Sequence, residues 1–139
     1  MATLQEAISQ IQAEIKAISG IREAPETPPD QINQFPFALC FARTGEYRIG
    51  PAGVMTGIHT IVLELHVARK DLTRDVPTAM KYAKSIPLAI LAALMDKTLT
   101  AIATLGTIRY EFGPLGWGGA ETIGFRFYID GVKTQDGIT

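Results

Sequence analysis

Apolar and polar residues alternate along several stretches of the chain, and this two-residue period predicts β-strands. Residues 58–69 place an apolar side chain at every second position from Ile61 to Val67, against a largely polar set. Two further alternating runs lie between residues 104 and 130 and flank the glycine-rich segment 113–119, which predicts a long hairpin. Residues 37–43 are mostly apolar and predict another strand. We therefore expect an antiparallel sheet of about four strands with one face on the core.

A period between three and four residues predicts a helix at the start of the chain. Residues 3–19 open with the capping box Thr3-Leu-Gln-Glu6 and close at Gly20. The apolar stripe of this helix consists of Leu4, Ile8, Ile11, Ile15 and Ile18. Because the stripe lasts only about two heptads, packing on the domain's own sheet is favoured over a coiled coil.

A second helical region begins near Asp71 and contains two prolines. Pro77 fits a helix only within its first turn, and Pro87 predicts either a break between two helices or a kink in a single one. Residues 88–95 are apolar nearly all round, so the second piece is expected to be the more buried of the two. The chain is thus predicted to have an α+β fold, with the N-terminal helix and the central helical region packed on the sheet.

Three segments lack a regular pattern. Residues 20–36 contain four prolines and predict an extended arm over the surface, and residues 43–57 contain four glycines and predict a second long loop. Residues 132–139 are polar and predict a mobile tail. The whole chain, 1–139, is expected to be a single domain made of helix 3–19, arm 20–36, sheet and helices 37–131, and tail 132–139.

Composition narrows the class of protein. Thirteen basic and fourteen acidic residues are interspersed along the 139 residues, which argues against a nucleic-acid platform but leaves a local basic patch open. The single cysteine, Cys40, excludes an internal disulfide, and its apolar surroundings predict a buried, inert thiol in a reducing compartment. No signal peptide or membrane span is recognisable, so we expect a soluble protein that is intracellular when made.

The sequence carries no recognisable catalytic or metal-binding pattern. His59, Glu64 and His66 are ordinary zinc ligands by type, but strand parity places Glu64 and His66 on one face and His59 on the other. A nucleophile elbow and a phosphate-binding loop are both missing from the sequence. We predict no catalytic, cofactor-binding or metal-binding residue, and hence a protein that is not an enzyme and carries no cofactor.

Candidate contact residues lie in the irregular segments and on the predicted outer strand faces. The only tryptophan, Trp117, stands among glycines, where it either caps its own core or contacts another surface. The outer strand faces carry long polar side chains, including Glu64, His66 and Tyr128, which indicates either solvation or pairing with a neighbouring subunit. The interface candidates are Trp117, Leu115, Tyr47, Arg48, Pro28, Pro29, Arg109 and Arg126.

Four segments taken in order carry a resemblance to a known group of proteins. They are residues 3–19, the entry Asn33-Gln-Phe-Pro-Phe37, the long run of residues 58–72, and the segment of residues 108–119 with its Trp-Gly-Gly turn. Together they resemble small neck and tail-completion proteins of long-tailed bacteriophages, and among these the tail terminators. The resemblance spans most of the chain and consists of strand patterns and a turn, without a catalytic motif.

The resemblance implies a compact α/β subunit with an antiparallel sheet and helices against it. It further implies a homo-oligomer, a hexameric ring on the head-proximal end of the tail tube, located in the virion and assembled in the host cytoplasm. Its partners would be the tail tube protein and the head-tail connector or stopper protein, with DNA only passing through the lumen and no membrane involved. Two alternatives remain open: a head-completion or other neck protein, and a cellular small-ligand-binding domain, which would be a monomer or dimer with an apolar pocket.

Overall fold

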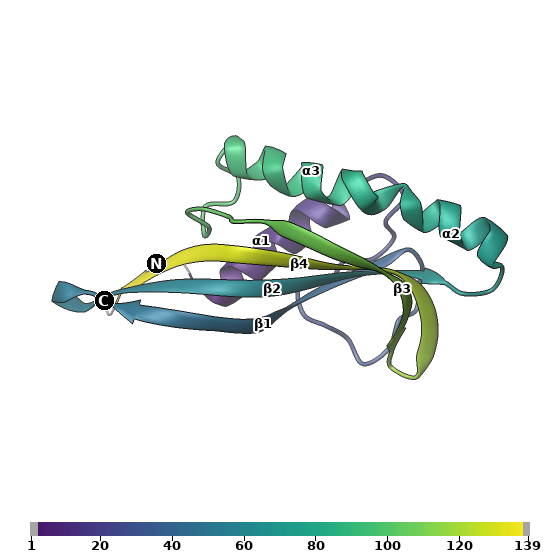
Figure 1. Ribbon diagram of the computed structural model, residues 1–139, viewed down its shortest axis with the longest axis horizontal. Helices are drawn as coiled ribbons and strands as arrows, with labels where there is room; N and C mark the ends of the chain where they lie inside the picture. Colours follow the sequence, from purple (N-terminus) through teal and green to yellow (C-terminus); the bar gives the residue numbers. More distant parts are fainter. Residues whose placement is uncertain (1–2, 138–139) are drawn as a thin grey trace.

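A four-stranded antiparallel sheet with the spatial order β1-β2-β4-β3 forms the framework of the protein (Figure 1). The computed structural model describes residues 3–137. The strands are β1 (Phe37–Ile49), β2 (Val54–Ala68), β3 (Ile108–Trp117) and β4 (Ala120–Gly137). The predicted α+β class and the number of strands are confirmed.

Three helices, α1 (Leu4–Lys16), α2 (Leu72–Met80) and α3 (Tyr82–Met95), cover the same face of the sheet (Figure 1). The core lies between them, where Ile11 and Ile15 of α1 and Ile86 of α3 meet Leu63 of β2 and Phe125 of β4. Each of these side chains is fully buried and contributes about 1.5–3 kcal/mol relative to an exposed position. The predicted core face of β2, from Ile61 to Val67, is therefore confirmed.

The N-terminal helix begins as its capping box predicts. The hydroxyl of Thr3 accepts a hydrogen bond from the backbone N–H of Glu6. The regular helix ends at Lys16, three residues before the predicted boundary, because the N–H of Ile18 bonds to the carbonyl of Ile15 in a tighter turn. Residues 20–36 form the expected arm, which bridges to the sheet between Glu23 and Phe37.

The second long loop predicted for residues 43–57 is wrong. Instead β1 continues to Ile49, a 3-10 turn spans Pro51–Gly53, and β2 begins at Val54, so the segment is a hairpin. Gly45 and Gly57 are strand residues. Glycine stands at both positions because a side chain at either one would collide with the imidazole ring of His59. These glycines make room for a neighbouring side chain and do not mark a loop.

The predicted tail at residues 132–139 is also wrong as far as the structure describes it. β4 runs to Gly137 and pairs with Val54–His59 of β2, and residues 138–139 lie outside the described part. Val132 and Thr134 are fully buried and Lys133 between them is exposed, which is the two-residue period of a strand with one covered face. The glycine-rich loop predicted at 113–119 likewise reduces to a two-residue turn, since β3 extends to Trp117 and only Gly118 and Gly119 lie outside the strands.

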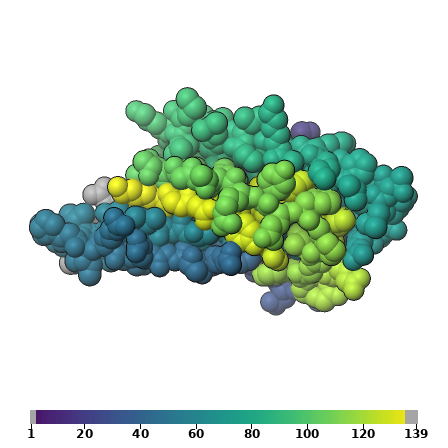
Figure 2. All heavy atoms as spheres, viewed as in Figure 1, coloured from purple at the N-terminus to yellow at the C-terminus, as the bar shows by residue number. Residues whose placement is uncertain are grey.

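The central helical region differs from the prediction in two respects. The break between α2 and α3 falls at Lys81, and both Pro77 and Pro87 lie inside helices, beyond the first turn. In the turn before Pro87, the hydroxyl of Ser85 donates a hydrogen bond to the carbonyl of Lys81, four residues earlier. The second helical piece is the more buried of the two, with four buried residues in α3 against two in α2. Its apolar residues Leu88, Leu91 and Met95 are nevertheless exposed, because no further layer covers the outer side of α3 (Figure 2).

Candidate functional site

The face of the sheet opposite the helices is closed over part of its length by two segments that are distant in sequence. We call it the outer face. It carries Phe37, Leu39, Phe41, Val62 and Tyr128, four of which are buried outside the main core beneath the helices. The prediction that this face is solvated is wrong for Glu64, His66 and Tyr128, which are all buried.

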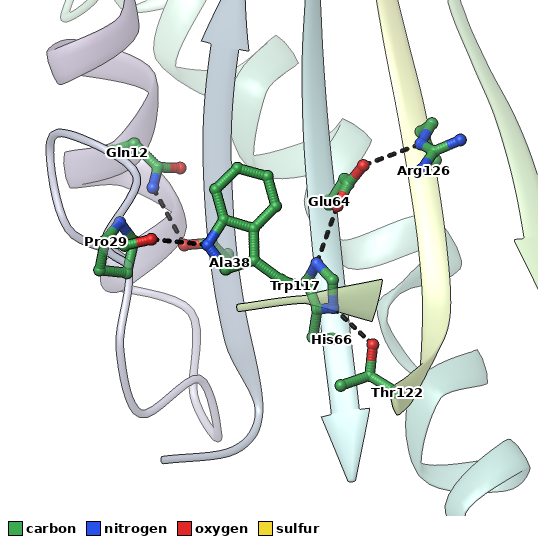
Figure 3. A network of polar contacts seen from close by, with 8 residues as sticks. All are labelled: Gln12, Pro29, Ala38, Glu64, His66, Trp117, Thr122 and Arg126. Carbon is green, nitrogen blue, oxygen red and sulfur yellow. Dashed lines mark hydrogen bonds and ion pairs between the residues drawn. The ribbon is translucent and has the colours of Figure 1, made fainter. Parts of the chain in front are cut away.

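The tip of the β3–β4 hairpin is one of the two covering segments, and the arm is the other (Figure 3). The indole N–H of Trp117 donates to the backbone carbonyl of Pro29 at 2.6 Å. Its ring stacks against Phe41, with centroids 6.1 Å apart and planes at 26°. A side chain at Gly118 would run into the carbonyl of Asp30, which shows how closely the tip approaches the arm. A shallow hollow of about 640 Å³ lies at this junction.

Two glycines face each other in the β3–β4 hairpin. Gly113 of β3 pairs with Gly124 of β4, and a side chain at Gly124 would collide with the backbone of Leu65. Glycine thus permits the close approach of β4 to β2 at this position, and the β3–β4 hairpin curves toward its tip (Figure 1). Trp117 and Leu115 both lie half-buried beyond this point.

Beneath the covered part of the outer face lies a hydrogen-bonded network of four side chains (Figure 3). His66 contacts Glu64 through Nε2 at 2.8 Å and the Thr122 hydroxyl through Nδ1 at 2.6 Å. The second carboxylate oxygen of Glu64 accepts from Nε of Arg126 at 2.8 Å. Burial raises the pKa of Glu64, but the hydrogen bonds from His66 and Arg126 outweigh it and leave this pKa below its ordinary value.

The hydroxyl of Thr122, the imidazole of His66 and the carboxylate of Glu64 form a hydrogen-bonded chain. A nucleophilic triad has its three groups in the same order. Thr122 and His66 have no exposed surface, so no substrate reaches the hydroxyl in this conformation. The network satisfies polar groups that the hairpin buries. Strand parity predicted the shared face of Glu64 and His66, but nothing in the sequence indicated Thr122.

The uncovered part of the outer face forms a groove of about 290 Å³ beside the network. The guanidinium groups of Arg43 and Arg109 lie over the Tyr128 ring, at 4.9 Å and 4.8 Å from its centroid. Arg109 also binds Asp130 through its Nε at 2.6 Å, and this hydrogen bond holds the pKa of the Asp130 carboxyl below its usual range. The predicted candidates Arg109 and Arg126 thus stand on the same face, each already paired with a carboxylate of its own chain.

The β1–β2 hairpin projects past the helices, together with the end of β4 (Figures 1 and 2). Every residue of β1 from Ala42 to Ile49 is exposed. Tyr47 rests its ring edge-on against His59, with centroids 5.2 Å apart, and Arg48 pairs with Glu46 at 3.3 Å. The predicted candidates Tyr47 and Arg48 are therefore accessible, and they lie far from Trp117, Pro28 and Pro29.

Large exposed apolar side chains gather on two surfaces. The first, which we call the hairpin patch, surrounds the end of the β1–β2 hairpin and consists of Tyr47 and Ile49 on one face and Val54 on the other. The second, the helix patch, runs along the outer side of α2 and α3 and consists of Leu72, Met80, Leu88, Leu91 and Met95. Of the nine large apolar side chains exposed within residues 3–137, only Tyr110 lies outside the two patches. The sequence did not predict the helix patch, because the nearly all-apolar residues 88–95 indicated a buried helix.

Two further observations concern chemistry and membranes. Within residues 3–137, no group of three or more His, Cys, Asp or Glu side chains is placed to hold a metal ion. Cys40 is buried, as predicted, and burial raises the pKa of its thiol far above the ordinary value. No helix in the described part of the chain has the length and apolarity needed to cross a membrane.

No model of a protein family matches the sequence, and no curated protein matches it either. The site is therefore defined by its geometry. It consists of an outer face partly covered by the arm and the β3–β4 tip, a projecting β1–β2 hairpin, and two exposed apolar patches.

Proposed function

We propose that the protein is a structural subunit of a bacteriophage virion that forms a ring on the head-proximal end of the tail tube. The ring would end growth of the tube and join the tail to the head connector or stopper protein. It would contain identical subunits, six by the resemblance to tail terminators, and DNA would only pass through its lumen. Assembly would take place in the host cytoplasm, with no cofactor and no enzymatic activity.

The observation that carries the proposal is the division of the exposed apolar surface into two separate patches. Apolar patches of this kind mark contact surfaces on soluble proteins. Two different patches on one chain favour heterologous contacts, in which unlike surfaces of identical subunits meet and a fixed rotation closes a ring. The α+β fold, with an antiparallel sheet and helices on one face, is also the architecture that the resemblance implies.

Deletion of the gene in the phage or prophage that carries it tests this function. We expect lysates with filled heads, unjoined tails and tubes of abnormal length, visible by electron microscopy, and rescue by the intact gene. Normal tail length with heads that leak DNA would identify a head-completion protein and contradict the terminator role. A normal yield of intact particles would contradict any role in assembly.

A further inference from the structure

The hairpin patch and the helix patch cannot cover each other within one molecule. The β1–β2 hairpin points away from the helices, and its tip forms one end of the molecule while α2 and α3 form a side (Figures 1 and 2). The most exposed members of the two patches are Ile49, at 85%, and Met95, at 75%. Covering both patches therefore requires another molecule.

The two patches have complementary shapes. The hairpin is a narrow projection that ends in the turn Pro51–Gly53, and the exposed apolar side chain of Ile49 lies just before this turn. Beside the C-terminal end of α3 lies a hollow of about 400 Å³, lined mainly by apolar side chains: Leu94, Leu99, Ile102 and Ala103, with Lys97 and Thr100. Met95 of the helix patch is the last residue of α3 and follows Leu94, so the hollow lies next to the end of the patch. A projection on one copy thus matches a recess on another.

The apolar area of the two patches suits one interface of ordinary size. A large apolar side chain has a total surface on the order of 200 Å². Multiplied by the exposed fractions of the members, this gives an exposed apolar area of roughly 500 Å² for the helix patch and roughly 350 Å² for the hairpin patch. An interface of standard size buries roughly 1,600 Å² in total, of which a little over half, or about 900 Å², is apolar. One hairpin patch and one helix patch supply about that amount together.

We propose that the hairpin patch of one copy binds the helix patch and its adjoining hollow on a second copy. Each subunit then offers its hairpin to one neighbour and its helices to the other, and both patches are covered by a single kind of contact. A symmetric contact between two helix patches would leave every hairpin exposed. The closure of this contact into a ring rests on the proposed function, whereas the pairwise contact can be measured without it.

The charged rims of the two surfaces fit this arrangement. Glu46 and Arg48 lie on the face of the hairpin that carries Val54, opposite Ile49, and Asp96 and Lys97 follow Met95 at the end of α3. Each surface therefore carries one charge of each sign next to its apolar centre. Rim charges of this kind set the orientation of two partners more than their affinity.

Two single substitutions test the proposal in the full-length protein. Ile49→Asp places a charge in the hairpin patch, and Leu91→Asp places one in the helix patch. Both positions are on the surface, and Ala13→Asp on the exposed side of α1 is the matched control. Thermal unfolding establishes that each variant is folded, and sedimentation at increasing concentration gives the association constant. We expect each patch variant to weaken self-association by roughly tenfold to a hundredfold and the control to leave it unchanged.

Mixing the two variants separates a heterologous contact from a symmetric one. The Ile49→Asp protein keeps an intact helix patch, and the Leu91→Asp protein keeps an intact hairpin patch. An equimolar mixture should therefore form dimers of one copy of each, although neither variant associates alone. Loss of association in Leu91→Asp only, with no rescue on mixing, would identify a helix-to-helix dimer and overturn the proposal.

Cysteine cross-linking gives an independent readout. Cys40 is buried, so thiols introduced as Ile49→Cys and Leu91→Cys are the reactive ones. We expect an intermolecular disulfide between the two different variants and none between copies of the same variant. A parent protein that stays monomeric at its highest soluble concentration and yields no mixed cross-link would also overturn the proposal. Tails that assemble normally with Ile49→Asp would overturn it too, while leaving the proposed function standing.

Discussion

The indole of Trp117 and the backbone carbonyl of Pro29, 2.6 Å apart, join the tip of the β3–β4 hairpin to the proline-rich arm. Residues separated by 88 positions are thereby held together over the outer face of the sheet. The contact supports the hypothesis that Trp117 caps its own fold. A further contact of this residue with another protein stays a prediction.

Replacing Trp117 should loosen the outer face. Because the ring is half-buried, Trp117→Ala is expected to lower the free energy of unfolding by about 2–3 kcal/mol, less than the 3–5 kcal/mol typical of a fully buried aromatic. Trp117→Phe keeps the stack on Phe41 and loses only the hydrogen bond, at about 1 kcal/mol. Urea unfolding measures both values. Two variants as stable as the parent would contradict the capping role of Trp117.

The glycine pair at the hairpin tip provides a matched test of how closely the tip meets the arm. Gly118 and Gly119 both have positive φ, at 59° and 81°, so alanine at either position introduces backbone strain of about 1 kcal/mol. Only at Gly118 would the added methyl group also collide with the carbonyl of Asp30, whereas Gly119 faces open space. Gly118→Ala should therefore cost at least about 1 kcal/mol more than Gly119→Ala. Equal losses in denaturant unfolding would mean that the tip is not seated on the arm.

Stability should fall in acid through the carboxylate of Glu64. Its folded-state pKa is lowered, so the stabilisation is present above the unfolded pKa of about 4.3 and is lost as the pH falls through the folded value. Asp130 and Asp75 contribute in the same direction, Asp130 through the hydrogen bond from Arg109 and Asp75 through the backbone N–H groups of Asp71 and Lys70. We expect the free energy of unfolding to decline below about pH 4.

Glu64→Gln isolates the part of this acid response that belongs to the network. The variant should be less stable than the parent at pH 7 by about 2 kcal/mol or more, because Arg126 and His66 lose a charged partner. It should also lose less stability than the parent between about pH 5 and pH 3. Glu14→Gln on α1 serves as the control. Parallel pH profiles for Glu64→Gln and the parent would contradict the assignment.

The sequence predicted what depends on a regular apolar pattern and missed what depends on contacts between distant segments. The stripe of α1, the core face of β2 and the β3–β4 hairpin follow from periodicity alone, and all are confirmed. The sequence placed Gly45 and Gly57 in a loop, although both are strand residues. They lack a side chain because the ring of His59 occupies that space. That reason becomes visible only when β1 and β2 are paired.

Burial was the least predictable property of the candidate site. Glu64 and His66 are polar and alternate with core residues, yet the arm and the hairpin tip bury them from the other side. Leu88 and Leu91 are apolar and helical, yet nothing covers them within one chain. In both cases the outcome depends on which segment lies on top, and a local sequence pattern carries no information about that.

The central claim is that identical subunits form a ring on the tail, with the hairpin of each subunit on the α2–α3 surface of the next. A cryo-electron microscopic reconstruction of the complete particle tests it most directly. The account predicts a closed ring of this chain at the head-proximal end of the tube, with Ile49 of one subunit beside Leu91 or Met95 of its neighbour. A particle that lacks the chain at this place, or holds it as separated subunits, would contradict the account.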